Sequence, residues 1–182
     1  MALTEPDSTA PTGEPRLPYA GEDFDGFYRR EFNETVTLAY ALSGRWGVAE
    51  ELAQEAFLVA HREWDRLSHY EQPRAFVRRV VVNAAVSHRR RAAAEARALV
   101  RLVAGQRPTP AVVGAEATAF WRLVRGLPRR QAQVTALFYL EDRSVEEIAE
   151  VLGCAEATVK VHLYRARAAL ARHLGTPGGK DE

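Results

Sequence analysis

The amino-acid sequence predicts an all-α protein made of two small helical domains joined by a flexible linker. Apolar residues recur at intervals of three and four along most of the chain, which is the spacing of one helix face. No segment shows the strict apolar–polar alternation of a half-buried strand. Two prolines and two glycines fall between residues 105 and 114, and this cluster indicates a boundary between two helical regions.

The chain of 182 residues is long enough for two domains that each bury a modest core. Residues 1–21 hold four of the nine prolines and are expected to form a disordered leader. Residues 22–102 form the first domain, and residues 103–115 form a linker that could span roughly 40 Å when extended. Residues 116–174 form the second domain, and residues 175–182 are a polar tail.

The first domain is expected to contain three helices. Apolar spacing predicts the first over about 23–42, before the breaking pair Ser43–Gly44, and the second over about 48–66. Pro73 opens the third helix, which continues to about residue 102, at a position where its missing N–H is harmless. In the second domain we expect four shorter helices, over about 116–125, 128–140, 145–152 and 156–173.

The last two helices have the pattern of a helix-turn-helix. Ser144 and Glu147 fit a capping box, and Gly153 stands where the first helix must stop and turn sharply. One face of the second helix is apolar, with Val159, Leu163, Ala166 and Leu170. The opposite face carries Lys160, Tyr164, Arg165, Arg167 and Arg172. In a helix-turn-helix such a face enters the major groove of DNA, and the alternative is an ordinary helical hairpin with a solvated basic face.

The charges are segregated along a nearly neutral chain. The total is +1, but residues 74–101 carry a net charge of +7 and residues 22–67 a net charge of −5. This segregation indicates one surface that faces a polyanion and a separate acidic surface. Only two of the 25 basic residues are lysines. Arginine suits nucleic acid because its guanidinium can fork onto phosphate or guanine.

Other classes of protein are disfavoured. The one cysteine, Cys154, excludes a disulfide framework or a multi-cysteine zinc site, and at the turn before the last helix we expect it to be structural. The five histidines form no pair at the four-residue spacing of a metal site. No apolar run approaches 18 residues and no signal peptide is evident, so we expect a cytoplasmic protein. We also expect no metal, no cofactor and no catalytic residues.

The pattern of the second domain extends beyond the helix-turn-helix. It includes Leu127-Pro-Arg-Arg, Ser144-Val-Glu-Glu-Ile-Ala-Glu-Val-Leu-Gly and Thr158-Val-Lys. These segments resemble region 4 of bacterial extracytoplasmic-function (ECF, group IV) sigma factors, and among these the chain looks like an actinobacterial member. The family reads the −35 promoter element with the second helix. The resemblance implies DNA contacts by Thr158, Lys160, Val161, Tyr164 and Arg165, with Arg167 on phosphate.

The first domain resembles region 2 of the same family. Ala49-Glu-Glu-Leu-Ala-Gln-Glu-Ala-Phe is similar to the segment that docks on the clamp helices of the largest polymerase subunit. The resemblance implies that core RNA polymerase is bound by Glu51, Gln54, Glu55 and Phe57. Taken alone, the same residues are more simply explained as a solvated acidic helix face, and the pattern of the second domain favours the polymerase contact.

Residues 73–91 resemble the part of region 2 that opens the −10 element. At about 100° per residue, one stripe about 60° wide holds Arg79, Asn83, Val86 and Arg90. Asparagine can pair with a base edge and arginine with phosphate. The run Arg89, Arg90 and Arg91 is a phosphate clamp by resemblance, or a solvated charge run by composition alone. Tyr70 is a candidate for stacking on a flipped −10 base, or else a loop anchor.

The two resemblances follow each other in the expected order. They imply an alternative sigma factor that binds core RNA polymerase and promoter DNA and directs transcription initiation. Such factors are commonly held inactive by an anti-sigma factor. Two alternatives stay open: a stand-alone helix-turn-helix regulator that does not require polymerase, and an interaction protein whose basic helix binds an acidic partner.

Overall fold

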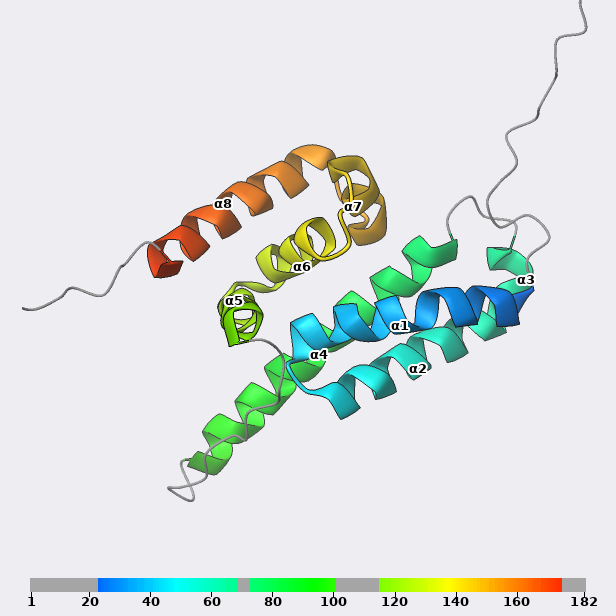
Figure 1. Ribbon diagram of the computed structural model, residues 1–182, viewed down its shortest axis with the longest axis horizontal. Coiled ribbons are helices and arrows are strands. Elements are labelled where there is room, and N and C mark those ends of the chain that lie inside the picture. The colour runs from blue at the N-terminus through cyan, green and yellow to red at the C-terminus, as the bar shows by residue number, and fades with distance from the viewer. Residues whose placement is uncertain (1–22, 69–72, 101–114, 175–182) are drawn as a thin grey trace, which may run out of the picture.

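The computed structural model describes residues 23–68, 73–100 and 115–174, and every regular element in these ranges is an α-helix (Figure 1). The all-α prediction is confirmed. The helices are α1 Phe24–Ser43, α2 Trp46–Arg62, α3 Trp64–Leu67, α4 Pro73–Val100, α5 Ala115–Gly126, α6 Arg129–Tyr139, α7 Val145–Leu152 and α8 Glu156–Leu174. The predicted leader, almost all of the linker, the tail and Tyr70 lie outside the described residues. Within the described ranges, no helix combines the length and the apolar character needed to cross a membrane.

The boundaries of the first helix follow from two local interactions. The Asp23 side chain accepts a hydrogen bond of 2.8 Å from the Gly26 backbone N–H and so caps the start of α1. Gly44 ends the helix with φ +78°, a left-handed conformation that favours glycine. The break predicted at this point is confirmed. The predicted second helix is divided, because the backbone leaves helical geometry at Glu63, between α2 and α3.

Helices α1, α2 and α4 pack into a three-helix bundle, and α3 closes one end of it (Figure 1). Aromatic rings fill this end. The Phe57 ring lies 5.7 Å from Phe27 and 5.1 Å from Tyr28 between centroids, and Phe24 lies 5.3 Å from Trp64. Phe57 is 2% exposed, whereas the adjacent Leu58 is 58% exposed. One face of α2 therefore belongs to the core and the other to the surface.

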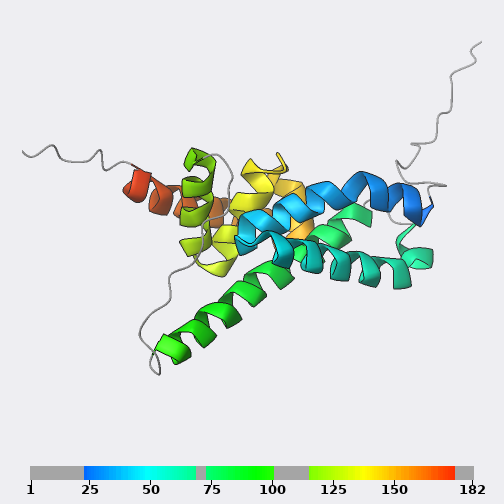
Figure 2. The same cartoon turned by 60° about the horizontal axis from the view of Figure 1, so that its bottom comes forward.

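Helix α4 is longer than its partners in the bundle. Its N-terminal half packs against α1 and α2, and its C-terminal half extends beyond both (Figures 1 and 2). The buried residues of the packed half include Val77, Val81, Val82 and Val86. The projecting half exposes Arg90 and Arg91.

Helices α5 to α8 form the second unit, in which α7 and α8 make the predicted helix-turn-helix. Both bonds of the capping box are present: the Ser144 hydroxyl accepts from the Glu147 N–H at 3.1 Å, and the Glu147 carboxylate accepts from the Ser144 N–H at 2.8 Å. Gly153 has φ +61°, as its position at the turn requires. The predicted apolar face of α8 is buried throughout: Val159, Leu163, Ala166 and Leu170.

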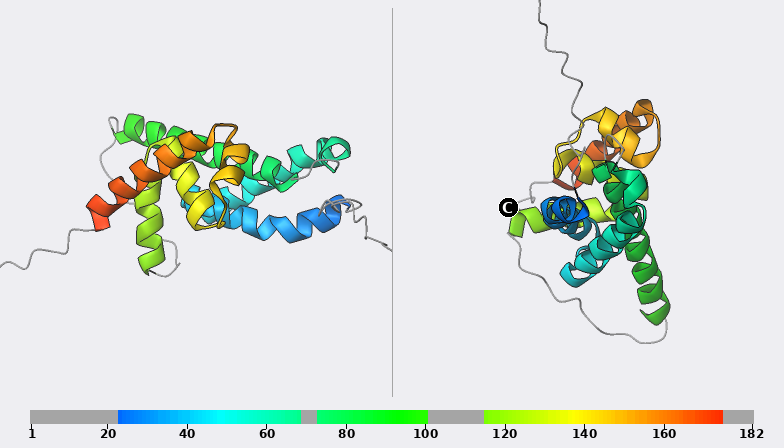
Figure 3. Two further views of the ribbon diagram at one scale, coloured as in Figure 1. Left: turned by 90° about the horizontal axis from the view of Figure 1, so that it is seen from above. Right: turned by 90° about the vertical axis from the view of Figure 1, so that its right-hand side faces the viewer.

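The two units pack against each other, which the apolar spacing did not indicate. Helix α1 contacts α5 and α6, and α4 contacts α6 and α7 (Figures 1 and 3). The buried residues of both units belong to one continuous apolar cluster. Arg125 on α5 donates a hydrogen bond of 3.1 Å to the Ala41 carbonyl on α1. Its guanidinium also lies against Gly44, where a Cβ would be 2.9 Å from the Arg125 Nε.

We predict that Ser144→Ala lowers the free energy of unfolding by about 0.5–2 kcal/mol, because it removes the N-cap of α7. Ser144→Asp is the matched control and should retain most of the stability, since aspartate is an equally good N-cap. Urea denaturation of the purified chain measures both. Equal stability of the alanine variant and the parent would mean that the cap contributes nothing.

We also predict that Phe57→Ala lowers the free energy of unfolding by about 3–5 kcal/mol, because it leaves a cavity in the aromatic cluster. The neighbouring exposed residue provides the control: Leu58→Ala should change stability by less than about 0.5 kcal/mol. Denaturation curves with the same slope for all three proteins make the comparison valid. Similar losses in the two variants would contradict the placement of Phe57.

Candidate nucleic-acid interface

The face of α8 opposite its buried residues carries all six side chains predicted to contact −35 DNA. Thr158, Lys160, Val161, Tyr164, Arg165 and Arg167 are exposed. Tyr164 is 75% exposed and Val161 46%, so this face offers apolar as well as polar and basic surface. Lys160 forms an exposed ion pair of 3.0 Å with Glu156, one helical turn earlier. Helix α8 packs on α5, α6 and α7 through its other face, so the described helices leave most of this surface uncovered.

Arg167 differs from the other five because its position is fixed by α6. Its Nε donates a hydrogen bond of 2.8 Å to the Tyr139 hydroxyl. Its guanidinium also lies over two rings, 5.3 Å from the centroid of Phe138 and 5.8 Å from that of Tyr139. A cation held against aromatic rings in this way is ordered before any ligand arrives. Arg167 is therefore better suited to contact a phosphate and position the helix than to read a base.

The stripe predicted on α4 does not face solvent as a unit. Arg79 is exposed, but its guanidinium lies against the helix-turn-helix: its Nη2 would be 3.1 Å from a Cβ built on Gly153. Asn83 is half-buried, and its Oδ1 accepts hydrogen bonds from Arg129 at 2.6 Å and from Gln133 at 3.0 Å. Both donors lie on α6. Arg79 and Asn83 therefore face the second unit.

Val86, which was also predicted to contact DNA, is fully buried in this structure and offers no surface for that contact here. An apolar residue on a stripe of polar ones is more simply explained by core packing, and the angular argument alone could not distinguish the two. Arg90, at the end of the stripe, is exposed as predicted.

The arginine run lies where α4 leaves the bundle. Arg90 and Arg91 are exposed, whereas Arg89 is half-buried. Burial, and next the positive charge of Arg90, lowers the pKa of the Arg89 guanidinium. These three side chains line a surface hollow together with Ser87. Concentrated positive charge of this kind attracts phosphate, which would relieve the repulsion between the guanidinium groups.

The acidic face of α2 is exposed at three of its four predicted residues: Glu51, Gln54 and Glu55. Phe57, the fourth residue predicted to contact the polymerase, is buried in this structure, because its ring fills the aromatic cluster. The exposed large apolar residues of α2 are Leu58, Val59 and Trp46. Trp46 is 51% exposed and donates through its indole N–H to Glu50 at 2.9 Å. Trp46 and Leu58 flank Gln54 at intervals of eight and four, a helical signal that the sequence contained.

Comparison with known protein families matches both units. Residues 27–95 match the family described as Sigma-70 region 2, and residues 117–170 match Sigma-70, region 4. The two matches cover the bundle and the helix-turn-helix unit in the order expected.

Individual relatives agree with the family matches. The ECF RNA polymerase sigma factor SigM of Mycobacterium tuberculosis (strain H37Rv) is 34% identical over 152 residues, covering 84% of this chain and 77% of SigM. SigW, an ECF RNA polymerase sigma factor of Bacillus subtilis, is 28% identical over 151 residues, covering 75% of this chain and 81% of SigW. The match to "Probable RNA polymerase sigma factor RfaY" of Xanthomonas campestris pv. campestris is 32% identical and covers 78% of this chain but 38% of RfaY.

Two solved structures share the fold. Sigma factor RpoE, in a complex with the anti-sigma factor NepR from Bartonella quintana, aligns with a TM-score of 0.67 and 23% identity, covering 86% of this chain and 99% of RpoE. CnrH, in a complex with the cytosolic domain of CnrY, aligns with a TM-score of 0.64 and 19% identity, covering 88% of this chain and 94% of CnrH. With the two family matches and the identity to SigM, these findings place the chain: it belongs to the extracytoplasmic-function family of alternative RNA polymerase sigma factors.

Proposed function

We propose that this sigma factor binds core RNA polymerase through α2, opens the −10 element with α4 and reads the −35 element with α8. The observation that carries the proposal is the surface of α8, where one polar, three basic, one aromatic and one aliphatic side chain are exposed while the opposite face is core. The chain would supply promoter specificity, and nucleotide addition would belong to the core enzyme.

The face of α8 has the chemistry needed to read duplex DNA. In the major groove, Lys160 and Arg165 offer donors to the acceptor edges of guanine, and Val161 offers apolar contact to a thymine methyl group. Arg167, held against α6, would contact phosphate and set the register of the helix. The early residues of the helix would then carry specificity, and the later basic residues would carry affinity.

The exposed face of α2 fits a basic and partly apolar partner surface. Glu51 and Glu55 supply negative charge, Gln54 supplies hydrogen bonds, and Leu58 and Trp46 supply exposed apolar area. Large apolar side chains within a polar surface are typical of binding sites, since a partner removes them from water. We therefore propose that Leu58 and Trp46 take the part that the sequence had assigned to Phe57.

On α4, we propose that Asn83 reads a base edge of the melted −10 strand while Arg79, Arg89, Arg90 and Arg91 contact phosphate. The concentration of arginine on this helix supports phosphate binding. Tyr70, outside the described residues, remains the candidate for base stacking. Because Asn83 and Arg79 face the second unit here, these contacts require the two units to separate.

We further propose that the chain is a group IV factor of the actinobacterial kind, that it acts in the cytoplasm, and that an anti-sigma factor holds it inactive. The similarity to a mycobacterial SigM supports the first point. The structure of RpoE, which was determined with the anti-sigma factor NepR, supports the last.

We predict that Glu51→Lys with Glu55→Lys weakens binding to core RNA polymerase at least about tenfold, or about 1.4 kcal/mol, because it reverses the charge of the docking face. The matched control is Glu146→Lys with Glu150→Lys, another exposed pair four residues apart, on α7. Affinity is measured by titrating labelled full-length chain with core enzyme, after circular dichroism has verified the helical content. If both pairs reduce affinity equally, the docking site is not on α2. If neither the variants nor the parent bind core enzyme, the result favours the alternative hypothesis of a stand-alone helix-turn-helix regulator.

We predict that Lys160→Ala weakens the binding free energy of the holoenzyme by about 1–3 kcal/mol on promoters with the cognate −35 sequence. The loss should be much smaller on a promoter with a scrambled −35 sequence. The cognate sequence is obtained by selecting a promoter pool, randomised at −35, with the reconstituted holoenzyme. Arg167→Ala serves as the contrast, since loss of a phosphate contact should weaken both promoters alike. An equal loss of affinity on cognate and scrambled DNA would mean that Lys160 contacts a phosphate and does not read a base.

A further inference from the structure

We propose that the packed arrangement of the two units is a self-inhibited state of this sigma factor, held closed by a buried ion-pair cluster centred on Arg78. The cluster bridges α1 and α4 of the first unit and the α6–α7 connection of the second. The proposal rests on the proposed role of α4 at the −10 element.

The geometry of the cluster joins the two units directly. Arg78 on α4 is 1% exposed, although arginine is rarely buried. Its Nη1 and Nη2 bind Glu31 and Glu34 on α1, at 2.5 and 2.8 Å. Its Nε donates to Glu141, in the α6–α7 connection, at 2.7 Å. Burial alone would lower the pKa of Arg78, but Glu141 and Glu31 outweigh it and hold that pKa above its ordinary value.

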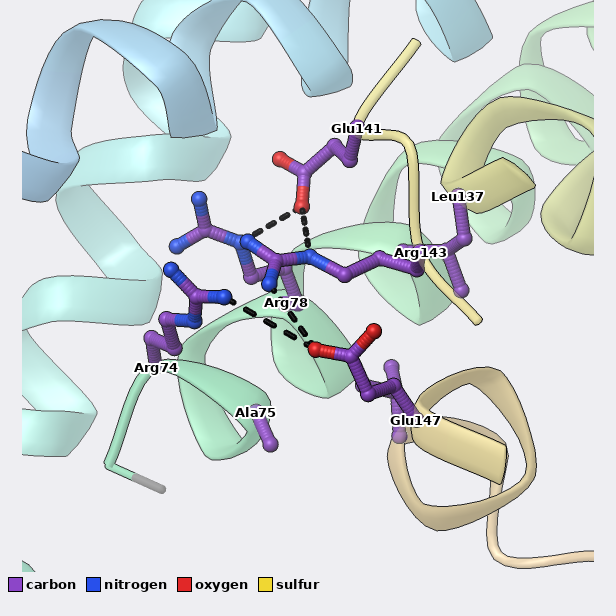
Figure 4. Close-up of a pocket in the computed structure, with 8 residues that line it drawn as sticks. Arg74, Ala75, Arg78, Leu137, Glu141, Arg143 and Glu147 are labelled. Atoms are coloured by element: carbon purple, nitrogen blue, oxygen red, sulfur yellow. Dashed lines mark hydrogen bonds and ion pairs between the residues drawn. The ribbon is translucent and has the colours of Figure 1, made fainter. Parts of the chain in front are cut away.

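Arg143 and Arg74 extend the cluster to a second carboxylate of the helix-turn-helix unit, Glu147. Figure 4 shows the Glu141 carboxylate between the guanidinium groups of Arg78 and Arg143. Arg143 lies 3.7 Å from Glu141 and 3.1 Å from Glu147. Arg74, on α4, reaches the same Glu147 across the boundary at 3.8 Å. Charges of both signs thus alternate along the boundary, and each unit contributes both signs.

The closed arrangement blocks the proposed −10 surface. The Asn83 Oδ1 already accepts two hydrogen bonds from α6, so it has no free lone pair for a base. Arg79, one helical turn earlier on α4, lies against Gly153 at the turn of the helix-turn-helix. A base cannot take the Asn83 acceptor while α6 occupies it, and a strand passing Arg79 would meet the turn that follows α7.

The charges also explain how the boundary could open without leaving a buried ion unpaired. On separation, Arg78 keeps Glu31 and Glu34 within its own unit, and Glu141 keeps Arg143 within the other. Both sets of charges would regain water, which offsets part of the ion pairing lost. An apolar boundary of the same area would instead expose only hydrophobic surface. The cluster therefore specifies one closed arrangement and permits its release.

The test uses Glu141→Lys, which places a positive charge against Arg78 while leaving Arg78 its two partners on α1. Glu146→Lys makes the same charge change at an exposed site on α7 and is the control. Distances between the units are measured in the full-length chain by pulsed electron–electron double resonance between two spin labels. Spin labels are placed at Arg62→Cys and Ala168→Cys, two exposed positions, in a Cys154→Ser background. We expect one short distance in the parent and the control, and a longer, broader distribution in Glu141→Lys.

The second measurement is binding of a single-stranded oligonucleotide carrying the non-template −10 sequence of a promoter selected by the holoenzyme. We expect Glu141→Lys to bind at least about fivefold more tightly than the parent, and the control to bind as the parent does. If circular dichroism shows that Glu141→Lys impairs folding, Arg129→Ala is used in its place. Arg129 is exposed, and its removal releases the Asn83 oxygen from one of its two donors, so this variant should also bind the oligonucleotide more tightly.

The outcomes separate the closed state from the function on which it depends. An unchanged distance distribution in Glu141→Lys overturns the cluster as the element that holds the units together. Opening without tighter oligonucleotide binding, in a variant that still initiates transcription with core enzyme, overturns self-inhibition and leaves the sigma function standing. If the parent itself gives no promoter-dependent transcription with core enzyme, the proposed function fails.

Discussion

A guanidinium buried among three carboxylates is the interaction on which the arrangement of this protein depends. Arg78 is 1% exposed, and an arginine removed from water is tolerated only when its donors are satisfied and its charge is balanced. Glu31 and Glu34 meet that requirement from α1, which ties α4 into its own bundle. Glu141 meets it from the second unit, which ties the two units together. One side chain thus serves both the internal packing of region 2 and its contact with region 4.

The same helix that carries this arginine carries the proposed −10 contacts, and the two roles use the same chemistry. The Asn83 oxygen that would pair with a base in DNA pairs here with Arg129 and Gln133. A polar stripe needs partners whenever it is taken from water, and either DNA or the second unit can supply them. This equivalence is the physical basis of competition between the closed arrangement and promoter DNA.

The helices could be predicted from sequence because their signals are local. Spacing of apolar residues, the Ser144–Glu147 capping box and Gly153 each act within a few residues, and the structure contains them where predicted. The exposed face of α8 followed from the same reasoning. Position on a helix wheel was insufficient for Phe57 and Val86, which turned inward, because each lies near the edge of a face and tertiary packing decides its side. Resemblance to the family assigned them a role that local geometry could not check.

Arg78 could not have been identified in this way. In the sequence it is one of eight arginines in a basic segment, and nothing local distinguishes it from its neighbour Arg79, which is exposed. Its partners lie 44, 47 and 63 residues away, so the cluster exists only once both units have folded and met. Contacts at such separations leave no periodic signal in a single chain. Proline and glycine between residues 105 and 114 favour a domain boundary, but they carry no signal of the contact between the two units.

The surfaces that remain accessible in the closed arrangement indicate an order of events under the proposed function. The acidic face of α2 and the polar face of α8 are both exposed, while Asn83 is covered. Docking of α2 on the polymerase therefore needs no prior opening, whereas capture of −10 bases does. A polymerase that binds region 2 and region 4 at separate places would favour the separated state by its difference in affinity for the two arrangements. The closed contact is suited to this because its charges retain partners in both states, so opening requires no unpaired buried ion.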